Sequence, residues 1–335
     1  MVFAQALAIV LQDCGKLAQA LDQWQRAIDV ARDIGAAHAL PDLLSMRATA
    51  LLLTGRARQA RDAMVEGREL LHDVPEDAMI LRPFTIRLQI VDRMLGHYAS
   101  SLALGDRVLS DPSAGSREAD DASLAHAFAY CDLGQPARVH HLLSQTKAPA
   151  DSFNGLFWKE VGAQMVQPTA QQHEARHRAL EAAAEAARQW SGRSRLVAWR
   201  IQAHHADDDE AVAAARRGVE FATACGMGGQ QLVFQALLAQ RLATLGDTSQ
   251  ALWLARDSWR LMADFCPTML YRGYVWRALI EVLEPHDASL GRTIVHSAAD
   301  WIFRTASEDV PAPFRESFLH RNPANAWLLA RAREL

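Results

Sequence analysis

The sequence predicts an all-α fold, a solenoid of about eight helix hairpins that ends in a C-terminal capping helix. Apolar residues recur at helical spacing along nearly the whole chain, and runs of β-branched residues are scarce. The 12 prolines fall where junctions or first helical turns are plausible, because proline breaks a helix interior. A pattern of small residues also repeats along the chain, which is the signature of a stacked array.

The repeated pattern is a turn residue followed by small or apolar residues five, nine and twelve positions later. In GKLAQALDQWQRA these residues are Gly15, Ala20, Trp24 and Ala27. Other copies begin at Gly55, Gly96, Gly134, Ala170, Ala206, Gly246 and His286, so that successive starts lie 36 to 41 residues apart. Small residues one helical turn apart let two helices approach closely. One hairpin cannot bury its apolar faces alone, so neighbouring hairpins must stack.

This spacing resembles the tetratricopeptide repeat (TPR), in the form of roughly 40 residues found in the maltose-activator type of bacterial regulator. The resemblance covers residues 1–300, and it implies a right-handed α-solenoid of TPR-like hairpins. The chain departs from the pattern in places: the aromatic residue expected early in the first helix is mostly missing, and the copies at Gly134 and His286 lack part of the small-residue set.

The two ends of the array are expected to differ. We assign residues 1–307 to the repeats and residues 308–335 to a cap that covers the end of the stack. The segment VPAPFRESFLHRNPANAWLLARA resembles the C-terminal signature of large bacterial signalling proteins and transcriptional regulators. These carry a regulatory ATPase module, often behind a DNA-binding or cyclase domain, and finish with a repeat array.

At the amino end, the apolar side chains of Phe3, Leu7 and Leu11 belong to the first helix and have no predicted cover. Upstream domains of a parent chain or a partner protein would supply that cover. We expect the first of these, because the resembling regulators keep their ATPase module before such an array.

Composition excludes several classes of protein. The 35 basic and 39 acidic residues are well mixed and give a net charge of −4, so direct binding to nucleic acid is not expected. The four cysteines are far apart and read as reduced thiols of a cytoplasmic protein. No signal peptide or membrane-spanning run is present, and no cofactor motif such as a P-loop occurs.

The stretch HEARH at residues 173–177 matches the zinc-peptidase pattern H-E-x-x-H. In such enzymes both histidines face one metal ion and the glutamate polarises a water molecule. The repeat register instead turns His173 and His177 towards solvent, so we expect a solvated helix face there, with a metallopeptidase as a lesser alternative.

Two further motifs have structural interpretations. GMGGQ at residues 226–230 joins two helices, so it is expected to be a helix C-cap and turn rather than a phosphate cradle. The histidine pairs at 140–141 and 204–205 are expected on exposed helix surfaces.

The expected function is non-catalytic recognition of a protein, a peptide or a small effector on the concave face, which the first helices of the hairpins line. The alternatives are a scaffold that stands alone and the metallopeptidase. Residues 271–277, YRGYVWR, form the densest cluster of aromatic and arginine side chains, the types that dominate binding hot spots. The candidate binding residues are Arg47, Glu160, Gln164, Arg195, Trp199, Arg200, Gln240, Tyr271, Tyr274, Trp276 and Arg277.

Overall fold

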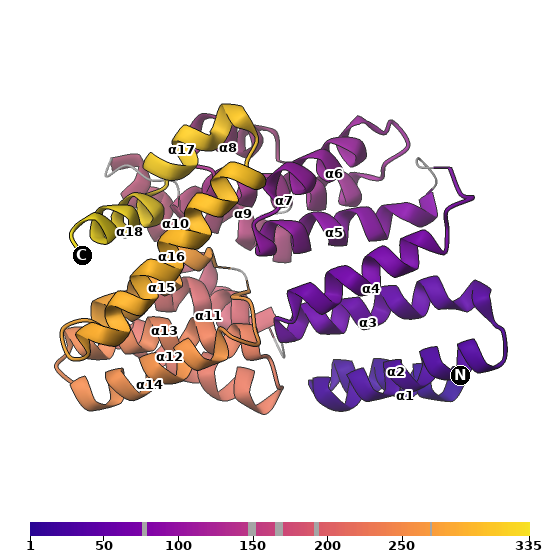
Figure 1. The fold of residues 1–335 in the computed structure, drawn as a ribbon, viewed down its shortest axis with the longest axis horizontal. Coiled ribbons are helices and arrows are strands. Elements are labelled where there is room, and N and C mark those ends of the chain that lie inside the picture. Colours follow the sequence, from indigo (N-terminus) through magenta and orange to yellow (C-terminus); the bar gives the residue numbers. More distant parts are fainter. Residues whose placement is uncertain (76–78, 147–151, 165–169, 191–193, 269) are drawn as a thin grey trace.

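The computed structural model describes residues 1–75, 79–146, 152–164, 170–190, 194–268 and 270–335. Within its helices, the side chains of residues 153, 163, 164 and 170–173 also lie outside the description. The described part of the chain consists of helices and turns, with no strand (Figure 1). The predicted all-α fold is therefore confirmed.

Sixteen helices form eight consecutive hairpins among the described residues. The first helices of the hairpins, which we call A helices, are α1 (Val2–Asp13), α3 (Leu40–Thr54), α5 (Arg82–Leu95), α7 (Ser116–Asp132), α9 (Phe153–Gln164), α11 (Ser194–His205), α13 (Gly228–Thr244) and α15 (Arg272–Leu283). Their partners, the B helices, are α2 (Leu17–Asp33), α4 (Ala57–Glu69), α6 (Tyr98–Ser110), α8 (Pro136–Gln145), α10 (Ala170–Gln189), α12 (Asp208–Ala224), α14 (Thr248–Leu261) and α16 (Ala288–Glu308). Short 3-10 helices lie at Ala37–Ala39, Met79–Leu81 and Ala312–Phe314.

The five predicted turn residues that are glycines directly follow A helices or their C-cap residues. Gly15, Gly55, Gly96, Gly134 and Gly246 all have positive φ angles, between 66° and 92°. A residue without a Cβ adopts this conformation at no steric cost, so each glycine reverses the chain into its B helix.

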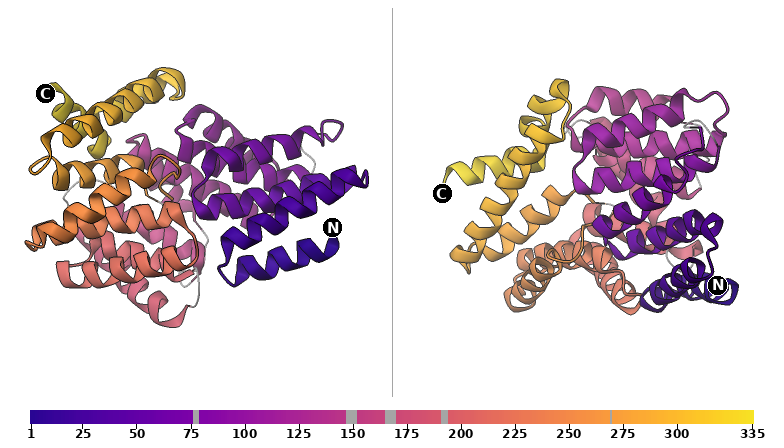
Figure 2. Two further views of the ribbon diagram at one scale, coloured as in Figure 1. Left: turned by 60° about the horizontal axis from the view of Figure 1, so that its bottom comes forward. Right: turned by 45° about the vertical axis from the view of Figure 1, so that its right-hand side comes forward.

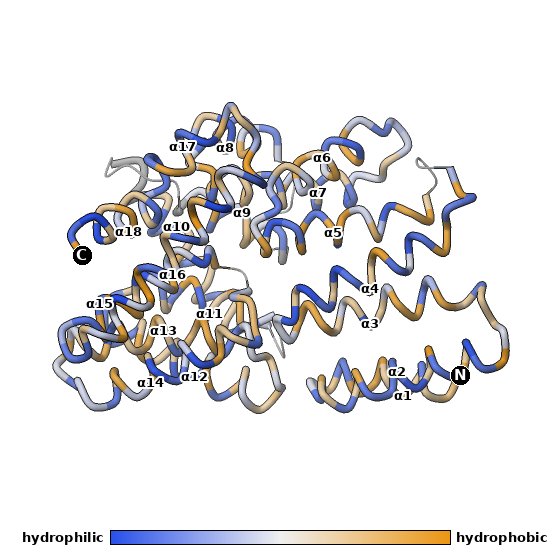
Figure 3. Tube along the Cα trace, viewed as in Figure 1, coloured by the Kyte–Doolittle hydropathy of each residue, from blue (hydrophilic) through white to orange (hydrophobic). Residues whose placement is uncertain are grey.

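Small residues on the B helices have the packing role that the repeat pattern implied. A Cβ added to Gly67 of α4 would lie 2.7 Å from Cε1 of Phe84, which belongs to the next A helix. A Cβ added to Gly218 of α12 would lie 2.3 Å from Cδ1 of Phe234, which belongs to α13. The missing side chain leaves the space into which the aromatic ring of the following hairpin fits. This packing makes the stack continuous, and in Figure 3 apolar and polar residues alternate along the helices as such packing requires.

The solenoid winds far enough for its second half to contact its first half (Figures 1 and 2). The amide of Cys266 donates a hydrogen bond of 2.8 Å to the carbonyl oxygen of Gly55, and the amide of Ala99 donates one of 2.8 Å to that of Asp309. We call this set of contacts the seam. On one side it consists of the turns at Gly15, Gly55, Gly96 and Gly134, and on the other of Cys225, Gly229, Cys266, Trp301, Asp309, Ser317 and Asn322.

The last two helices, α17 (Arg315–His320) and α18 (Pro323–Arg333), pack against α15 and α16. They also extend the seam. The hydroxyl of Ser317 donates to the carbonyl oxygen of Leu133 at 2.7 Å, and the side-chain Nδ2 of Asn322 donates to the carbonyl oxygen of Asp132 at 2.7 Å. The C-terminal segment thus contacts both the eighth hairpin and the turn of the fourth, a second contact that the sequence did not indicate.

The opposite end of the array is open. Phe3 of α1 is 81 % exposed, while Leu7 and Leu11 are half-buried. None of the described helices combines the length and the apolar character needed to cross a membrane.

Candidate functional site

The A helices line an open-sided cavity of about 740 Å³. Pockets for small ligands commonly have volumes of about 300–1,000 Å³. The cavity extends from α3 to α13, so six hairpins contribute to one site. Its described lining is Thr49, Leu52, Leu53, Pro83, Ile86, Arg87, Ile90, Arg93, Met94, Arg117, Glu118, Asp121, Leu124, Ala125, Phe128, Asn154, Phe157, Ser194, Leu196, Val197, Met227, Gln230 and Thr268.

Helical periodicity explains how α5 and α7 supply much of this lining. On α5, Pro83, Ile86, Ile90 and Met94 are spaced three or four residues apart, so they share one face, and Arg87 belongs to the same face. On α7, residues 117–118, 121, 124–125 and 128 follow the same spacing. More than half of the lining residues are apolar, so the cavity is suited to the apolar body of a ligand.

Arg87 is a half-buried cation of the wall that has no charged partner among the described residues. Burial lowers the pKa of its guanidinium from the ordinary value. Its Nη1 donates a hydrogen bond of 3.1 Å to the hydroxyl of Ser45 on α3. Among the described residues, no carboxylate raises the pKa of Arg87. A half-buried cation therefore faces the cavity beside a neutral hydroxyl.

Arg93, by contrast, has a carboxylate partner that compensates its charge. Its Nε and Nη2 donate to the carboxylate of Asp132 at 2.8 and 3.1 Å, and its guanidinium lies 4.9 Å from the ring centre of Phe128. Burial opposes the charge on Arg93, but Asp132 more than offsets this and raises the pKa of the arginine. This pair supports the wall and leaves little uncompensated charge for a ligand.

The acidic groups of the wall lie on α7 and have partners elsewhere. Glu118 accepts from Arg82 at 3.1 Å and from the amide of Gly115 at 2.9 Å. The carboxylate of Asp121 accepts a hydrogen bond of 2.7 Å from the side-chain Nδ2 of Asn154 on α9. Since Arg87 contacts α3 and Asp121 contacts α9, the cavity has a cationic end near α3 and an acidic end near α9.

Thr268 supplies an additional polar group. The residue is 5 % exposed, and its hydroxyl oxygen has no hydrogen-bond partner in the described part of the chain. A buried hydroxyl without a partner costs about 1–3 kcal/mol, which a ligand or a water molecule would recover.

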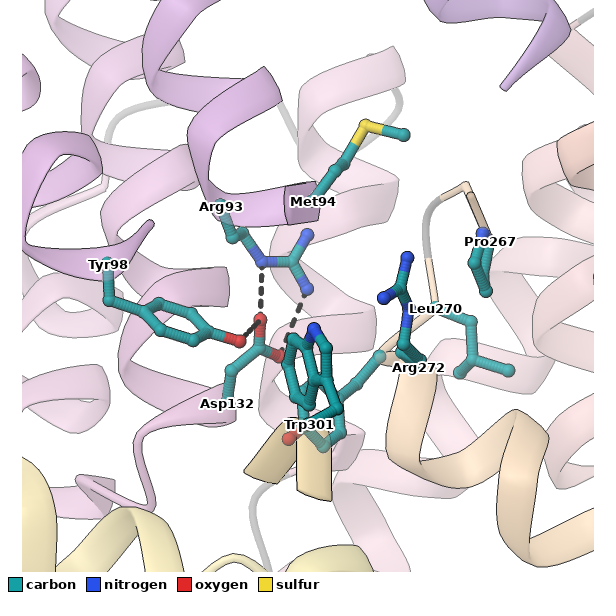
Figure 4. A pocket seen from close by; sticks show the side chains of 9 residues that line it. Arg93, Met94, Tyr98, Asp132, Pro267, Leu270, Arg272 and Trp301 are labelled. Carbon is teal, nitrogen blue, oxygen red and sulfur yellow. Dashed lines mark hydrogen bonds and ion pairs between the residues drawn. The ribbon is translucent and has the colours of Figure 1, made fainter. Parts of the chain in front are cut away.

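Beside the main cavity lies a second one of about 20 Å³, large enough for one water molecule (Figure 4). Arg93, Tyr98 and Asp132 form one wall, where the hydroxyl of Tyr98 donates to Asp132 at 3.2 Å. On another side the guanidinium of Arg272 lies 5.3 Å from the ring centre of Trp301. This small cavity lies next to the seam, and residues from both halves of the solenoid line it.

The predicted candidates on α9 and α11 lie mainly in the core. Glu160 and Arg200 are completely buried and form a bidentate ion pair. Trp199 is 9 % exposed, and Arg195 donates to the carbonyl oxygen of Trp190. Glu160 and Arg200 thus connect two A helices. The side chain of Gln164, another predicted candidate, lies outside the described part of the structure.

The candidates on α13 and α15 form a second group. Gln240 and Arg277 both donate to the carboxylate of Glu281. Tyr274 is half-buried and packs edge-on against the ring of His204 at 5.6 Å.

Tyr271 and Trp276 of the same group are 6 % and 4 % exposed, and the hydroxyl of Tyr271 donates to Asn325 of α18 at 2.7 Å. Arg47 on α3 is half-buried, and its Nε has no hydrogen-bond partner among the described residues. None of the eleven candidates belongs to the described lining of the large cavity. Their role in binding a partner stays a prediction.

Arg87, Thr268 and the apolar wall were not among the predicted site residues. The wall could have been predicted from the apolar residues of α5 that recur at helical spacing, which are Pro83, Ile86, Ile90 and Met94. Arg87 interrupts that apolar face, and its position there marks the cationic end of the cavity.

The HEARH segment lies on α10. The imidazole of His177 is 73 % exposed and lies 3.5 Å from the carboxylate of Glu181, while Glu174 pairs with Arg178 at 2.9 Å. The side chain of His173 lies outside the described residues. Within the described part of the chain, no group of three or more residues could hold a metal ion.

The two histidine pairs have different environments. His140 and His141 are exposed, as expected. The expectation was wrong for the second pair, because His205 is 8 % exposed and His204 is half-buried. Burial is the main cause that lowers the pKa of His204 to about 3, and nearby arginines lower it further. The same causes hold the pKa of His205 well below its ordinary value.

No protein-family model and no curated protein matches this chain. Among solved structures, the chain is similar to one described as the crystal structure of Rap protein complexed with competence and sporulation factor. The similarity has a TM-score of 0.45 and 15 % sequence identity, and it covers 88 % of this chain and 96 % of the other. A likeness of this size carries no argument about function.

Proposed function

We propose that this chain is a non-catalytic recognition module whose inner cavity binds a ligand. The observation that carries the proposal is the cavity of about 740 Å³, which six consecutive A helices line with mainly apolar residues. A space of this size and character fits a small effector or the apolar part of a short peptide.

The position of the cavity supports a sensing role. Each hairpin of a solenoid contacts mainly its neighbours, so curvature is a soft, collective property of the array. A ligand that touches six hairpins would stabilise the curvature to which it binds best relative to other curvatures of the array. An attached domain could respond to this change in curvature.

We further propose that the module belongs to a larger cytoplasmic regulator in which it controls an ATPase and a transcriptional output. The resemblance of residues 310–332 to the C-terminal signature of such regulators supports this context. The reading frame upstream of Met1 tests it: a fused ATPase sequence supports the proposal, whereas a scaffold that stands alone would have none.

Binding of N-phenyl-1-naphthylamine, a neutral apolar fluorophore, tests the cavity directly. The fluorophore should bind with saturable fluorescence enhancement, and Ile90→Trp, which narrows the cavity, should weaken binding about tenfold or more. Ile34→Trp is the matched control, because Ile34 is 65 % exposed and lies outside the described lining. No saturable binding to the wild type, or equal effects of the two substitutions, would contradict the proposal.

A further inference from the structure

We propose that the ligand of the cavity is an amphipathic molecule with one carboxylate, and that Arg87 binds this carboxylate at the α3 end. The inference rests on the proposed function and specifies its ligand. It follows from the uneven distribution of charge along an otherwise apolar wall.

The first step concerns the cation. Arg87 is half-buried at the cavity wall, and the only hydrogen bond described for its side chain goes to the neutral hydroxyl of Ser45. A guanidinium offers five N–H donors, so donors remain for a ligand. Carboxylates match the planar fork of a guanidinium, and a charge-assisted pair is stronger where water is partly excluded.

The second step concerns the competing charges. Arg93 forms an ion pair with Asp132, and Glu118 forms one with Arg82. Arg117 is exposed to solvent. Asp121 lies towards α9, where it accepts from Asn154. Repulsion between Asp121 and an anion therefore favours the α3 end, and Arg87 is the uncompensated cation of the described wall there.

The third step concerns the rest of the ligand. The surface next to Arg87 is apolar: on α5 Ile86 precedes it and Ile90 follows it, and Leu52 and Leu53 line the cavity from α3. A ligand anchored at Arg87 must lay its remaining atoms on this apolar surface, so a molecule charged along its whole length does not fit. One anionic head and one apolar body match the cavity.

Competition between a fatty acid and the alcohol of the same chain length separates the contribution of the carboxylate to binding from that of the apolar chain. Decanoate and decan-1-ol displace bound N-phenyl-1-naphthylamine from the purified protein, and the ratio of their inhibition constants reports the contribution of the carboxylate. In the wild type we expect decanoate to bind about tenfold or more tightly than decan-1-ol, as a charge-assisted hydrogen bond would provide.

Variants then assign this preference to a residue. Arg87→Gln should reduce the ratio to about one and leave the affinity for decan-1-ol within about twofold, and Arg87→Lys should keep much of the preference because it keeps the charge. Arg292→Gln is the control: Arg292 is an exposed arginine of α16 outside the described lining, so the same change in net charge should leave the ratio unchanged.

The outcomes distinguish the two proposals. If the fluorophore does not bind at all, the proposed recognition function fails. If it binds but the wild type prefers the alcohol, shows no preference, or releases the fluorophore to neither competitor, the carboxylate inference is overturned and the function stands. A preference for decanoate that persists in Arg87→Gln also overturns it, because another group then binds the anion.

Discussion

Replacing Gly229 by alanine is expected to weaken the seam. A Cβ at this position would lie 2.5 Å from the carbonyl oxygen of Cys266, 2.9 Å from Cα of Gly55 and 2.9 Å from Cγ2 of Thr268. Two of these neighbours are backbone atoms, which cannot rotate away as a flexible side chain can. The two halves of the solenoid must therefore separate by several tenths of an ångström.

The magnitude follows from two opposing effects. Overpacking of this kind usually costs about 1–3 kcal/mol. Alanine is a better helix former than glycine by about 1 kcal/mol in a helix interior, but Gly229 is the second residue of α13, where the gain is smaller. The expected net loss is about 1–2 kcal/mol, and it should fall mainly on the hydrogen bond from the Cys266 amide to Gly55.

Amide hydrogen exchange and urea unfolding measure this effect. A local loss of about 1.4 kcal/mol corresponds to roughly tenfold faster exchange in peptides that contain residue 266. Gly162→Ala serves as the control, because its Cβ would meet only Cδ1 of Leu143 at 3.9 Å, and it should be neutral or stabilising. If Gly229→Ala matches the wild type in both stability and exchange, the seam contact does not exist in solution.

Three further predictions concern buried polar groups. Asp132→Asn should lower the free energy of unfolding by about 3–5 kcal/mol, because it leaves the charge of Arg93 buried and unpaired; a loss below 1 kcal/mol in urea unfolding would refute this. In the same assay, Asn322→Ala should lower the free energy of unfolding by about 1 kcal/mol more than Asp247→Ala does. Both residues cap helices, but only Asn322 also donates to the carbonyl oxygen of Asp132 across the seam. Equal losses would contradict that role. The folded-state pKa of His205 lies below its ordinary value of 6.5, so the unfolded chain binds more protons, and His205 alone should contribute a fall in stability of about 2 kcal/mol between pH 7 and pH 5, beside the fall due to His204. Urea titrations should show a smaller fall for His205→Gln, and an identical fall would exclude His205 as the cause.

The hairpins were predictable because their determinants are local. A glycine such as Gly55 ends one helix, and the small residues that follow it, Ala60 and Gly67, let the next helices approach closely. Both effects involve residues that lie close together in the sequence, so a period of about 39 residues was enough to indicate eight hairpins.

The seam could not be predicted in the same way. Whether Gly55 meets Gly229 depends on small rotations that accumulate over several hairpins, and no short sequence pattern specifies that sum. The same limit explains the error at His204 and His205, which end α11 and would be exposed in an isolated hairpin. Neighbouring arginines and Tyr274 bury them in the folded array.

The seam and the cavity are physically linked, because they share a segment of the chain. Met227, Gln230 and Thr268 line the cavity, and Gly229 and Cys266 between them form the seam with Gly55. Leu52 and Leu53, on the other side, line the cavity just before Gly55. A ligand that contacts both sides and binds more tightly when the seam contacts are formed would stabilise those contacts. By the same factor, formation of the seam contacts would strengthen binding of the ligand. Under the proposed function, occupation of the cavity would thereby be connected to the winding of the whole solenoid.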